Sequence, residues 1–323
     1  MIRSLLVRET ACTDPYENLA LEQALLEGIR PGECVLYLWQ NENTVVIGKN
    51  QNPWKECKTA LLQEEGGKLA RRLSGGGAVF HDLGNLNFTF LMSQEDYDLD
   101  RQLTVIQTAL ASLGIPCQRS GRNDILADGR KFSGNAFYKN GKQAYHHGTL
   151  LVSADMDKLN RYLSPSKAKL QSKGVDSVRS RVVNLREFRS DLTIDLLKSA
   201  LIRAFSQVYS LEAIPMPPAF PAPERIRALA ERNRSWDWNF GSKLPFTLEC
   251  EGRFSWGSVQ LQLNMESGII RSAKVFTDAM DWCLAPSLEA ALQGCPFHRD
   301  ALPQALGTDG PAGDLFKLLE SCM

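Results

Sequence analysis

Apolar and polar positions along the chain predict short helices and strands in close succession. Leucines and alanines recur at helical spacing after Asp14-Pro15, a capping residue followed by a proline suited to a first helical turn, so a helix is expected over about 15–27. Apolar and β-branched runs at 34–39 and 44–48 then flank a polar Asn-Glu-Asn segment. This pattern predicts a buried β-hairpin.

The next part of the chain predicts two helices with a strand between them. A helix is expected from 53 to about 65, where a Gly-Gly pair ends it, and residues 87–91 alternate as a strand does. Apolar residues at helical spacing over 103–113 predict the second helix. Gly114 suits the left-handed position that follows many helices, and Pro116 prevents continuation.

Two Asx-Gly dipeptides, Asp128-Gly129 and Asn140-Gly141, separate three strand-like segments within 124–152. Such dipeptides favour the tight turns of hairpins, because both residues readily adopt positive φ. The segment therefore predicts a three-stranded antiparallel meander, with Lys131 early on its middle strand.

The C-terminal third predicts a second, smaller domain. A helix expected over 192–209 is followed by five prolines within 215–223, a composition typical of an extended, semi-rigid connector. Beyond a predicted boundary at 241–245, strand-like runs at 252–264 and 268–278 precede two short helices.

Composition and charge exclude several classes of partner. The 323 residues are 43% hydrophobic and 23% charged, which is typical of a soluble globular protein. Thirty-seven basic residues balance thirty-seven acidic ones, so no global field attracts nucleic acid or anionic membranes. No apolar run approaches the ~18 residues of a membrane span, and the amino terminus lacks a signal-peptide core. We expect a cytoplasmic protein.

The eight cysteines show neither a CxxC pair nor the histidine spacing of a zinc site, which favours free thiols. None lies between Cys117 and Cys250, so a thiol nucleophile is excluded from the middle of the chain.

The candidate chemistry centres on a glycine run. Arg71 and Arg72 precede Ser74, which is followed by Gly75, Gly76 and Gly77. Three glycines permit positive φ and leave no Cβ in the way, so successive backbone N–H groups can point at one anion. The two arginines add fixed positive charge. The pattern predicts a local anion-binding loop.

Several motifs then resemble bacterial two-domain lipoate-protein ligases, within the biotin/lipoate ligase superfamily. The main ones are 71–85 (RRLSGGGAVFHDLGN), 121–124 (GRND), 130–136 (RKFSGNA) and 146–151 (HHGTLL). Further matches are 52–57, 177–182, 236–241 and 275–278. Because they occur in order and span nearly the whole chain, the resemblance covers both expected domains.

The resemblance implies an α+β fold. A catalytic domain of residues 1–243 would carry a large mixed or antiparallel sheet with flanking helices, and an accessory α+β domain would follow over 246–323. It also implies a two-step reaction with ATP and Mg2+. Lipoate becomes lipoyl-AMP with release of pyrophosphate, and the lipoyl group then passes to a lysine of an apo lipoyl-domain protein. Such acceptors are acyltransferase subunits of 2-oxo acid dehydrogenases and the glycine cleavage H protein. A monomer is expected.

Each step needs positive charge where negative charge develops, because a carboxylate must approach a phosphate. By resemblance, Lys131 is the catalytic residue that holds the α-phosphate and lipoyl carbonyl oxygens, and Asp124 is the Mg2+ ligand. The nucleotide or acyl-adenylate would contact Arg72, Gly75, Gly76, Gly77, Ala78, Val79, Phe80, Asn123, Asp124 and Lys131. Lipoate would contact Leu19, Leu21, Trp39, Val46, Arg72, Ser74, His81, Lys131 and His147.

Some assignments stay open at this level. Either His81 or His147 is as readily a hydrogen-bonded core group as an acid or base, and Glu22 on the first helix is expected to be solvated surface. A transferase that uses preformed lipoyl-AMP, an octanoyltransferase and a noncatalytic lipoate or nucleotide sensor are the alternative functions. The cysteine gap argues against the octanoyltransferase, which holds its acyl group on a thiol.

Overall fold

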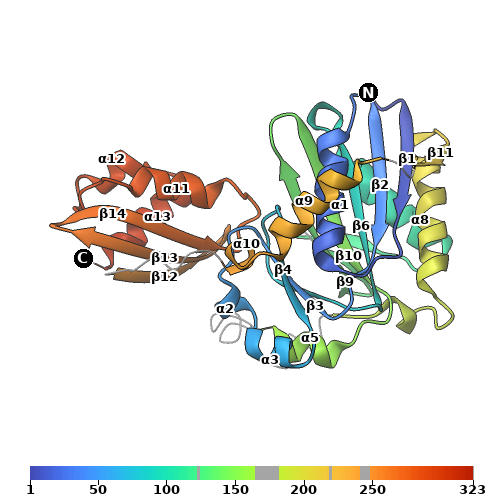
Figure 1. Ribbon diagram of the computed structural model, residues 1–323, viewed down its shortest axis with the longest axis horizontal. Coiled ribbons are helices and arrows are strands. Elements are labelled where there is room, and N and C mark those ends of the chain that lie inside the picture. Colours follow the sequence, from blue (N-terminus) through green and yellow to red (C-terminus); the bar gives the residue numbers. More distant parts are fainter. Residues whose placement is uncertain (122–123, 164–181, 218–219, 241–247, 323) are drawn as a thin grey trace.

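The computed structural model describes residues 1–121, 124–163, 182–217, 220–240 and 248–322. Two lobes stand side by side in it (Figure 1). The larger, which we call the N-terminal lobe, contains the described residues up to 240, and the C-terminal lobe contains residues 248–322. The expected α+β fold, with a large mixed sheet and a smaller C-terminal unit, is confirmed.

The N-terminal lobe is built on an eight-stranded sheet in the order β11-β1-β2-β6-β10-β9-β8-β7. Its strands are β1 (Ser4–Glu9), β2 (Glu33–Trp39), β6 (Asn85–Ser93), β7 (Gln118–Ser120), β8 (Asp124–Ala127), β9 (Arg130–Lys139), β10 (Gln143–Leu151) and β11 (Ala213–Pro215). The β11–β1 and β1–β2 pairs are parallel, and the remaining pairs are antiparallel. The sheet is therefore mixed.

Helices cover both faces of this sheet, which explains why β2 is apolar throughout. Alternate residues Cys34, Leu36 and Leu38 face a core shared with α4 (Leu99–Ser112) and α8 (Ile194–Tyr209). The intervening residues face α1 (Pro15–Gly28) on the other side. Burial on both faces leaves no solvent-facing row for polar residues. Asp14 caps α1 by accepting hydrogen bonds from two backbone N–H groups, as predicted.

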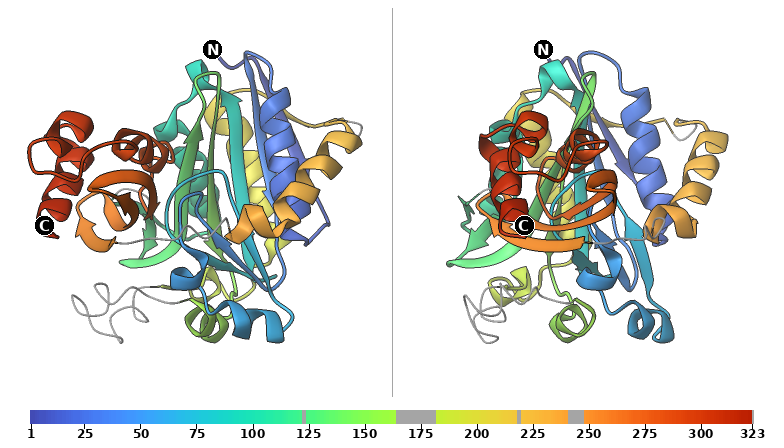
Figure 2. Two further views of the ribbon diagram at one scale, coloured as in Figure 1. Left: turned by 60° about the vertical axis from the view of Figure 1, so that its left-hand side comes forward. Right: turned by 90° about the vertical axis from the view of Figure 1, so that its left-hand side faces the viewer.

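The proline-rich segment does not lead directly into the C-terminal lobe. β11 first pairs with β1, and Met216 is buried against the α1 side of the sheet. The chain then forms α9 (Pro223–Arg234), which packs beside α1 (Figures 1 and 2), and α10 (Trp236–Phe240). The predicted boundary at 241–245 lies outside the described residues.

The hairpin predicted for the second and third strands is wrong. β2 joins the large sheet, whereas β3 (Thr44–Ile47) lies at the centre of a separate sheet between β4 (Lys68–Arg71) and β5 (Val79–His81). The polar linker does not form a tight turn, because the side chain of Asn41 is buried and hydrogen-bonded to Asn18. Side-chain anchoring thus directs the two strands into different sheets.

Other local predictions have clearer outcomes. The antiparallel β8–β9–β10 meander is confirmed, and Asp128 and Gly129 both adopt positive φ between its first two strands. The single helix expected after Pro53 is instead two short ones, α2 (Pro53–Glu56) and α3 (Thr59–Glu64), because Cys57 is extended and bridges to Leu163. The N-terminal lobe also contains α5 (Met156–Tyr162) and 3-10 turns at Gln94–Asp96 and Leu185–Glu187.

The C-terminal lobe has its own core. An antiparallel sheet of β12 (Leu248–Phe254), β13 (Gly257–Glu266) and β14 (Ile269–Thr277) packs against α11 (Leu284–Leu292), α12 (Leu302–Leu306) and α13 (Gly310–Glu320). The described lobe thus contains three helices where the sequence predicted two. Across the described parts of both lobes, no helix is long and apolar enough to cross a membrane.

Arg71 fastens the end of β4 to two distant segments. Arg71 is 8% exposed. Its guanidinium donates to the carbonyls of Gly48 at 3.1 Å, Lys49 at 3.0 Å and Gln51 at 2.8 Å. It also donates to the carbonyls of Trp238 and Asn239. Trp238 donates its indole N–H back to the Arg71 carbonyl at 2.9 Å. The Arg71 cation is therefore structural and does not contribute to an anion site.

Replacing Arg71 with alanine is expected to destabilise the protein by about 2–4 kcal/mol, because several buried carbonyls lose a charged hydrogen-bond donor. The midpoint and slope of urea unfolding measure this change. Arg227→Ala is the matched control, since Arg227 is largely exposed on α9. Equal midpoints for the two variants would contradict the structural assignment of Arg71.

Candidate functional site

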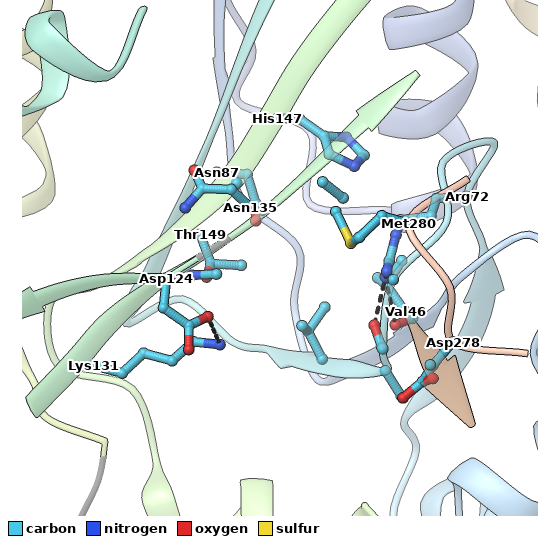
Figure 3. A pocket seen from close by; sticks show the side chains of 18 of the residues that line it. Val46, Arg72, Asn87, Asp124, Lys131, Asn135, His147, Thr149, Asp278 and Met280 are labelled. Carbon is cyan, nitrogen blue, oxygen red and sulfur yellow. Dashed lines mark hydrogen bonds and ion pairs between the residues drawn. The ribbon is translucent and has the colours of Figure 1, made fainter. Parts of the chain in front are cut away.

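A cavity of about 510 Å³ opens where the two lobes meet (Figure 3). Its walls come from the large sheet, the glycine loop and the C-terminal lobe. The lining residues of the N-terminal lobe are Leu19, Trp39, Val46, Arg72, Gly76, Gly77, Ala78, Val79, His81, Asn87, Asp124, Lys131, Gly134, Asn135, Ala136, His147, Gly148 and Thr149. Those of the C-terminal lobe are Arg253, Phe254, Ser255, Trp256, Gly257, Asp278 and Met280.

Most residues predicted from sequence meet in this cavity. Twelve of them are wall residues, namely Leu19, Trp39, Val46, Arg72, Gly76, Gly77, Ala78, Val79, His81, Asp124, Lys131 and His147. Leu21 instead packs in the buried cluster under α1, and Phe80 packs in the buried cluster against the sheet of β3, β4 and β5. Gly75 and Ser74 lie behind the wall and contact its residues. Asn123 lies outside the described residues, as do 177–181 of a further motif.

The register of the large sheet places an aromatic residue at one end of the cavity and a charged residue at the other. Trp39 of β2 pairs with Asn87 of β6, which pairs with Thr149 of β10. Thr149 accepts a hydrogen bond from the Gly134 N–H of β9, and Gly134 pairs with Asp124 of β8. Neighbouring strands lie about 4.8 Å apart, so this row crosses roughly 19 Å from an aromatic end to a charged end.

Lys131 and Asp124 form the charged end. Their Nζ and Oδ1 atoms are 2.6 Å apart, and each side chain is about one-third exposed (35% and 36%). A Cβ on Gly134 would lie 3.2 Å from the Lys131 Nζ, so glycine at this position leaves room for the ammonium to cross the strand. Lys131 thus faces the cavity and is not directed into bulk solvent, which places an ammonium and a carboxylate side by side in the wall (Figure 3).

Arg72 shapes the glycine loop from inside. It is 5% exposed, and its Nη2 donates to the carbonyls of Gly75 and Gly77, each at 2.7 Å. Its Nη1 donates to the Val46 carbonyl at 3.2 Å. Burial lowers the pKa of Arg72 to about 10, so the guanidinium remains a cation at neutral pH. Much of its hydrogen-bonding capacity therefore fixes the loop.

The glycine loop contacts the C-terminal lobe directly. Gly76, at φ +85°, donates its N–H to the Ala279 carbonyl at 3.1 Å. A Cβ on Gly75 would lie 2.3 Å from that same oxygen and 2.7 Å from the Met280 carbonyl. The run of open N–H donors expected from the sequence is therefore partly engaged by protein, and the absence of a Cβ at Gly75 serves lobe packing.

A buried polar chain lies behind the aromatic end. Glu22 Oε1 is 2.8 Å from Nδ1 of His147, and His147 Nε2 is 2.8 Å from Ser74 Oγ. Arg72 Nε donates to that Oγ at 3.0 Å, and Thr89 donates to Glu22 at 2.7 Å. A carboxylate only accepts, so Nδ1 of His147 carries a proton.

This Ser-His-Glu order resembles a hydrolase triad, but its setting differs. Ser74 is fully buried and already accepts from Arg72, so its hydroxyl has no approach to a substrate carbonyl. Glu22 is 2% exposed, and the expectation that it is solvated is wrong. The chain of hydrogen bonds links a buried carboxylate to a buried guanidinium and holds both in place.

His81 lines the cavity as a neutral imidazole. Asn18 donates to the Oδ1 of Asn41, which fixes the orientation of that amide, so the Asn41 Nδ2 donates to Nδ1 of His81. The proton of the imidazole must then be on Nε2, a buried atom without a protein partner. Burial beside Arg72 lowers the pKa of His81 to about 3. His81 is therefore a hydrogen-bond donor and not a base at neutral pH.

The predicted site residues do not include every wall residue. Asn87 is 2% exposed and its Oδ1 accepts from Asn85 at 2.9 Å; its only sequence signal is a polar residue within an apolar strand. Five other wall residues lie within the motifs 130–136 and 146–151 but were not predicted as site residues, namely Gly134, Asn135, Ala136, Gly148 and Thr149. In the C-terminal wall, Asp278 ends the motif 275–278, whereas residues 253–257 and Met280 have no sequence signal, because their place depends on how the lobes meet.

The possible metal ligands in the cavity can be compared with the coordination that the expected Mg2+ ion requires. No group of three or more histidine, cysteine or acidic residues suited to a metal occurs among the residues that the structure describes. Mg2+ commonly keeps several waters and takes one or two carboxylates beside substrate phosphates. Asp124, a cavity-facing carboxylate next to a cation, fits that weaker requirement.

Two family models match the chain. Residues 14–206 match the lipoyl protein ligase A/B catalytic domain, and residues 243–310 match the bacterial lipoate protein ligase C-terminus.

Solved structures of similar proteins agree with these matches. LipL1 of P. falciparum, solved in complex with lipoate, is 28% identical, with a TM-score of 0.84 over 99% of this chain and 98% of that one. A lipoate-protein ligase A bound with ATP is 28% identical, with a TM-score of 0.62 over 75% of this chain and 99% of that one. A bi-partite lipoate protein ligase of Thermoplasma acidophilum, described with its E2 lipoyl domain, is 27% identical, with a TM-score of 0.64 over 77% and 100%.

The buried histidines should make stability fall on acidification. Burial lowers the pKa of His81 to about 3 and that of His146 well below its ordinary value. Below about pH 6.5 the unfolded chain therefore binds protons that the folded chain does not. The free energy of unfolding should fall by about 1.4 kcal/mol per pH unit for each histidine as the pH falls from about 6 to 4.

Urea unfolding at a series of pH values measures this slope. His81→Gln should remove about half of the histidine part of the slope, since one of the two groups is lost. His298→Gln is the control, because His298 is 68% exposed and should leave the slope unchanged. An unchanged slope for His81→Gln would contradict the buried, neutral state.

The loop glycines supply a matched pair of variants. Gly75→Ala should loosen the contact between the lobes, because the new Cβ meets two backbone carbonyls. Gly77→Ala should leave the contact intact, since nothing lies within 4 Å of the added Cβ. Hydrogen exchange over 275–282 is expected to be at least about tenfold faster in the first variant only. Equal exchange in both variants would show that the close approach is not needed.

Proposed function

The chain belongs to the lipoyl protein ligase A/B family, and on that premise we propose that it is an ATP-dependent lipoate-protein ligase. A lipoate carboxylate oxygen attacks the α-phosphorus of ATP, and the bond to pyrophosphate breaks. The ε-amine of an acceptor lysine then attacks the carbonyl carbon of lipoyl-AMP, and AMP leaves. The acceptor is the lipoyl domain of another protein.

One observation carries this proposal: a single cavity joins a charged end that contains Lys131 to an aromatic, apolar end along one row of the sheet. A fatty acid with a carboxylate head requires that combination. With its head at Lys131, its chain would extend across the strands toward Trp39 and Val46. Leu19 and the imidazole ring of His81 would complete the slot.

Lys131 is the proposed catalytic residue. In the first step its ammonium draws the carboxylate and the α-phosphate together, although both are anions. In the second step the same ammonium stabilises the oxyanion that forms when the amine attacks. The ion pair with Asp124 holds Nζ in the wall and would have to loosen as phosphate oxygens compete for it.

Asp124 is the proposed ligand of Mg2+, which when bound supplies positive charge that offsets the phosphates. Arg72 and the loop from Gly75 through Phe80 are the proposed nucleotide-binding elements, together with Asn123. Arg72 would act largely through the loop, because its guanidinium is hydrogen-bonded to the loop carbonyls. Its positive charge would still favour a bound anion.

Ser74 and His147 are proposed as supports of the lipoyl slot. The chain Glu22–His147–Ser74–Arg72 connects the back of the aromatic end with the base of the loop. The position of the aromatic end of the cavity is therefore coupled to the position of the glycine loop. We also propose the division into a catalytic domain of residues 1–243 and an accessory domain of residues 246–323.

The alternatives make different demands on the cavity. An octanoyltransferase needs a thiol to carry its acyl group, and the cavity wall contains no cysteine among the described residues. A transferase limited to preformed lipoyl-AMP would not need to hold pyrophosphate. A noncatalytic sensor would not need Lys131 to face the bound carboxyl group.

Lys131→Ala should reduce the rate of lipoate-dependent pyrophosphate release by about 10²–10³-fold, because a preorganised charge at the reacting oxygens is lost. The assay uses ATP, Mg2+ and lipoate without acceptor, and a second assay follows lipoylation of a lipoyl domain. Lys142→Ala is the control, since Lys142 is an exposed lysine in the turn at the far end of β9 from Lys131. Wild-type rates in Lys131→Ala would reject its assignment.

Activity of the wild type separates the remaining alternatives. No pyrophosphate release, combined with lipoylation from added lipoyl-AMP, would identify a transferase. Failure of both reactions in protein that still binds lipoate would favour a sensor.

A further inference from the structure

Two thiols meet in the C-terminal lobe, far along the chain from the residues of the proposed reaction. Cys250 and Cys322 are both free, and their Sγ atoms are 2.6 Å apart with no atom between them. Cys250 lies on β12, the first strand of the lobe, and Cys322 follows α13, its last helix. The pair therefore joins the two ends of the lobe across 72 residues.

The two sulfurs differ in access. Cys322 is exposed and lines a surface hollow with Phe297, His298, Arg299 and Glu320. Cys250 is 4% exposed beneath it. Both basic side chains of the hollow have acidic partners, because Arg299 pairs with Glu320 and Nδ1 of His298 lies 3.6 Å from an Asp300 carboxylate oxygen. An exposed thiol backed by a buried one is the arrangement typical of redox-sensitive pairs.

We propose that Cys250 and Cys322 are a redox modification site that closes into a reversible disulfide. The oxidant is a low-molecular-weight disulfide of the glutathione type. The Cys322 thiolate attacks one sulfur, giving a mixed disulfide and releasing one glutathione thiolate. The Cys250 thiol then loses its proton and attacks Cys322 Sγ, releasing the second glutathione. Two protein thiols are oxidised and one oxidant disulfide is reduced.

The other cysteines of the lobe show why this pair is specific. Cys295 is buried and its thiol contacts the Pro296 carbonyl at 3.4 Å, whereas Cys283 is exposed near the lobe junction. Among the described residues, neither Cys295 nor Cys283 has a recorded contact with another cysteine sulfur. They provide matched controls, one buried and one exposed.

Closure of the pair would restrain the lobe as a whole. A cross-link between its first strand and its last helix excludes many open conformations of the unfolded segment. The end of β12 and the following turn form part of the cavity wall, so oxidation would also restrain that wall. This inference does not depend on the proposed ligase activity.

The test treats the full-length protein with oxidised glutathione, blocks free thiols with iodoacetamide, and maps disulfides by peptide mass spectrometry. The expected product is a Cys250–Cys322 linked peptide that dithiothreitol removes. Cys283→Ser and Cys295→Ser should still form it. Cys322→Ser should take up no glutathione at the pair, whereas Cys250→Ser should accumulate glutathione on Cys322.

Two results would overturn the proposal. One is a wild-type protein that stops at the mixed disulfide on Cys322, since the sulfurs would then not meet in solution. The other is full alkylation of both cysteines under conditions that oxidise a reference dithiol protein. A second measurement is hydrogen exchange of the lobe, which should slow several-fold on oxidation in the wild type and remain unchanged in Cys322→Ser.

Discussion

Two adjacent guanidinium groups, buried against backbone carbonyls, hold this structure together at its functional centre. Arg71 points to the segments at 48–51 and 238–239, and Arg72 points to the glycine loop. Their opposite directions follow from the alternation of side chains at the end of a strand. Each offers five donors in a planar fork, so a single side chain satisfies carbonyls that no regular strand or helix pairs. The carbonyls of Gly75 and Gly77 are thereby held by a protein donor in the ligand-free structure.

The large sheet supplies the second constraint, because it fixes the order of side-chain types along the cavity. The strands β2 and β6 and the three strands of the meander contribute one residue each to a single row, so the side chains change from aromatic to charged over five strands. This order needs no flexible loop, because register fixes it. Helices pack on both faces of the sheet, and the cavity is lined by this row and by the C-terminal lobe. Figure 2 shows that lobe beside the sheet.

Sequence patterns predicted well what depends on neighbours along the chain. Capping at Asp14, the turn at Asp128-Gly129 and the meander that carries Lys131 all follow from local backbone preferences. They failed where partners are remote. Glu22 is buried because His147 and Thr89 approach it from other strands, and β3 leaves its expected hairpin because β4 and β5 pair with it. Apart from Asp278, which ends the motif 275–278, the cavity-lining residues of the C-terminal lobe had no pattern of their own, since only the docking of the two lobes places residues 253–257 and Met280 there.

The hydrogen bond from Gly76 to Ala279 gives the molecule a built-in competitor. An incoming anion that uses the same N–H must displace a carbonyl tethered to the same chain, whose effective concentration does not fall on dilution. The observed affinity of the loop for an anion would then be its intrinsic affinity multiplied by the fraction of molecules in which that carbonyl has withdrawn. If the loop binds an anion as proposed, weak ligands would be rejected for this reason, and occupancy of the loop would be thermodynamically linked to the position of the second lobe.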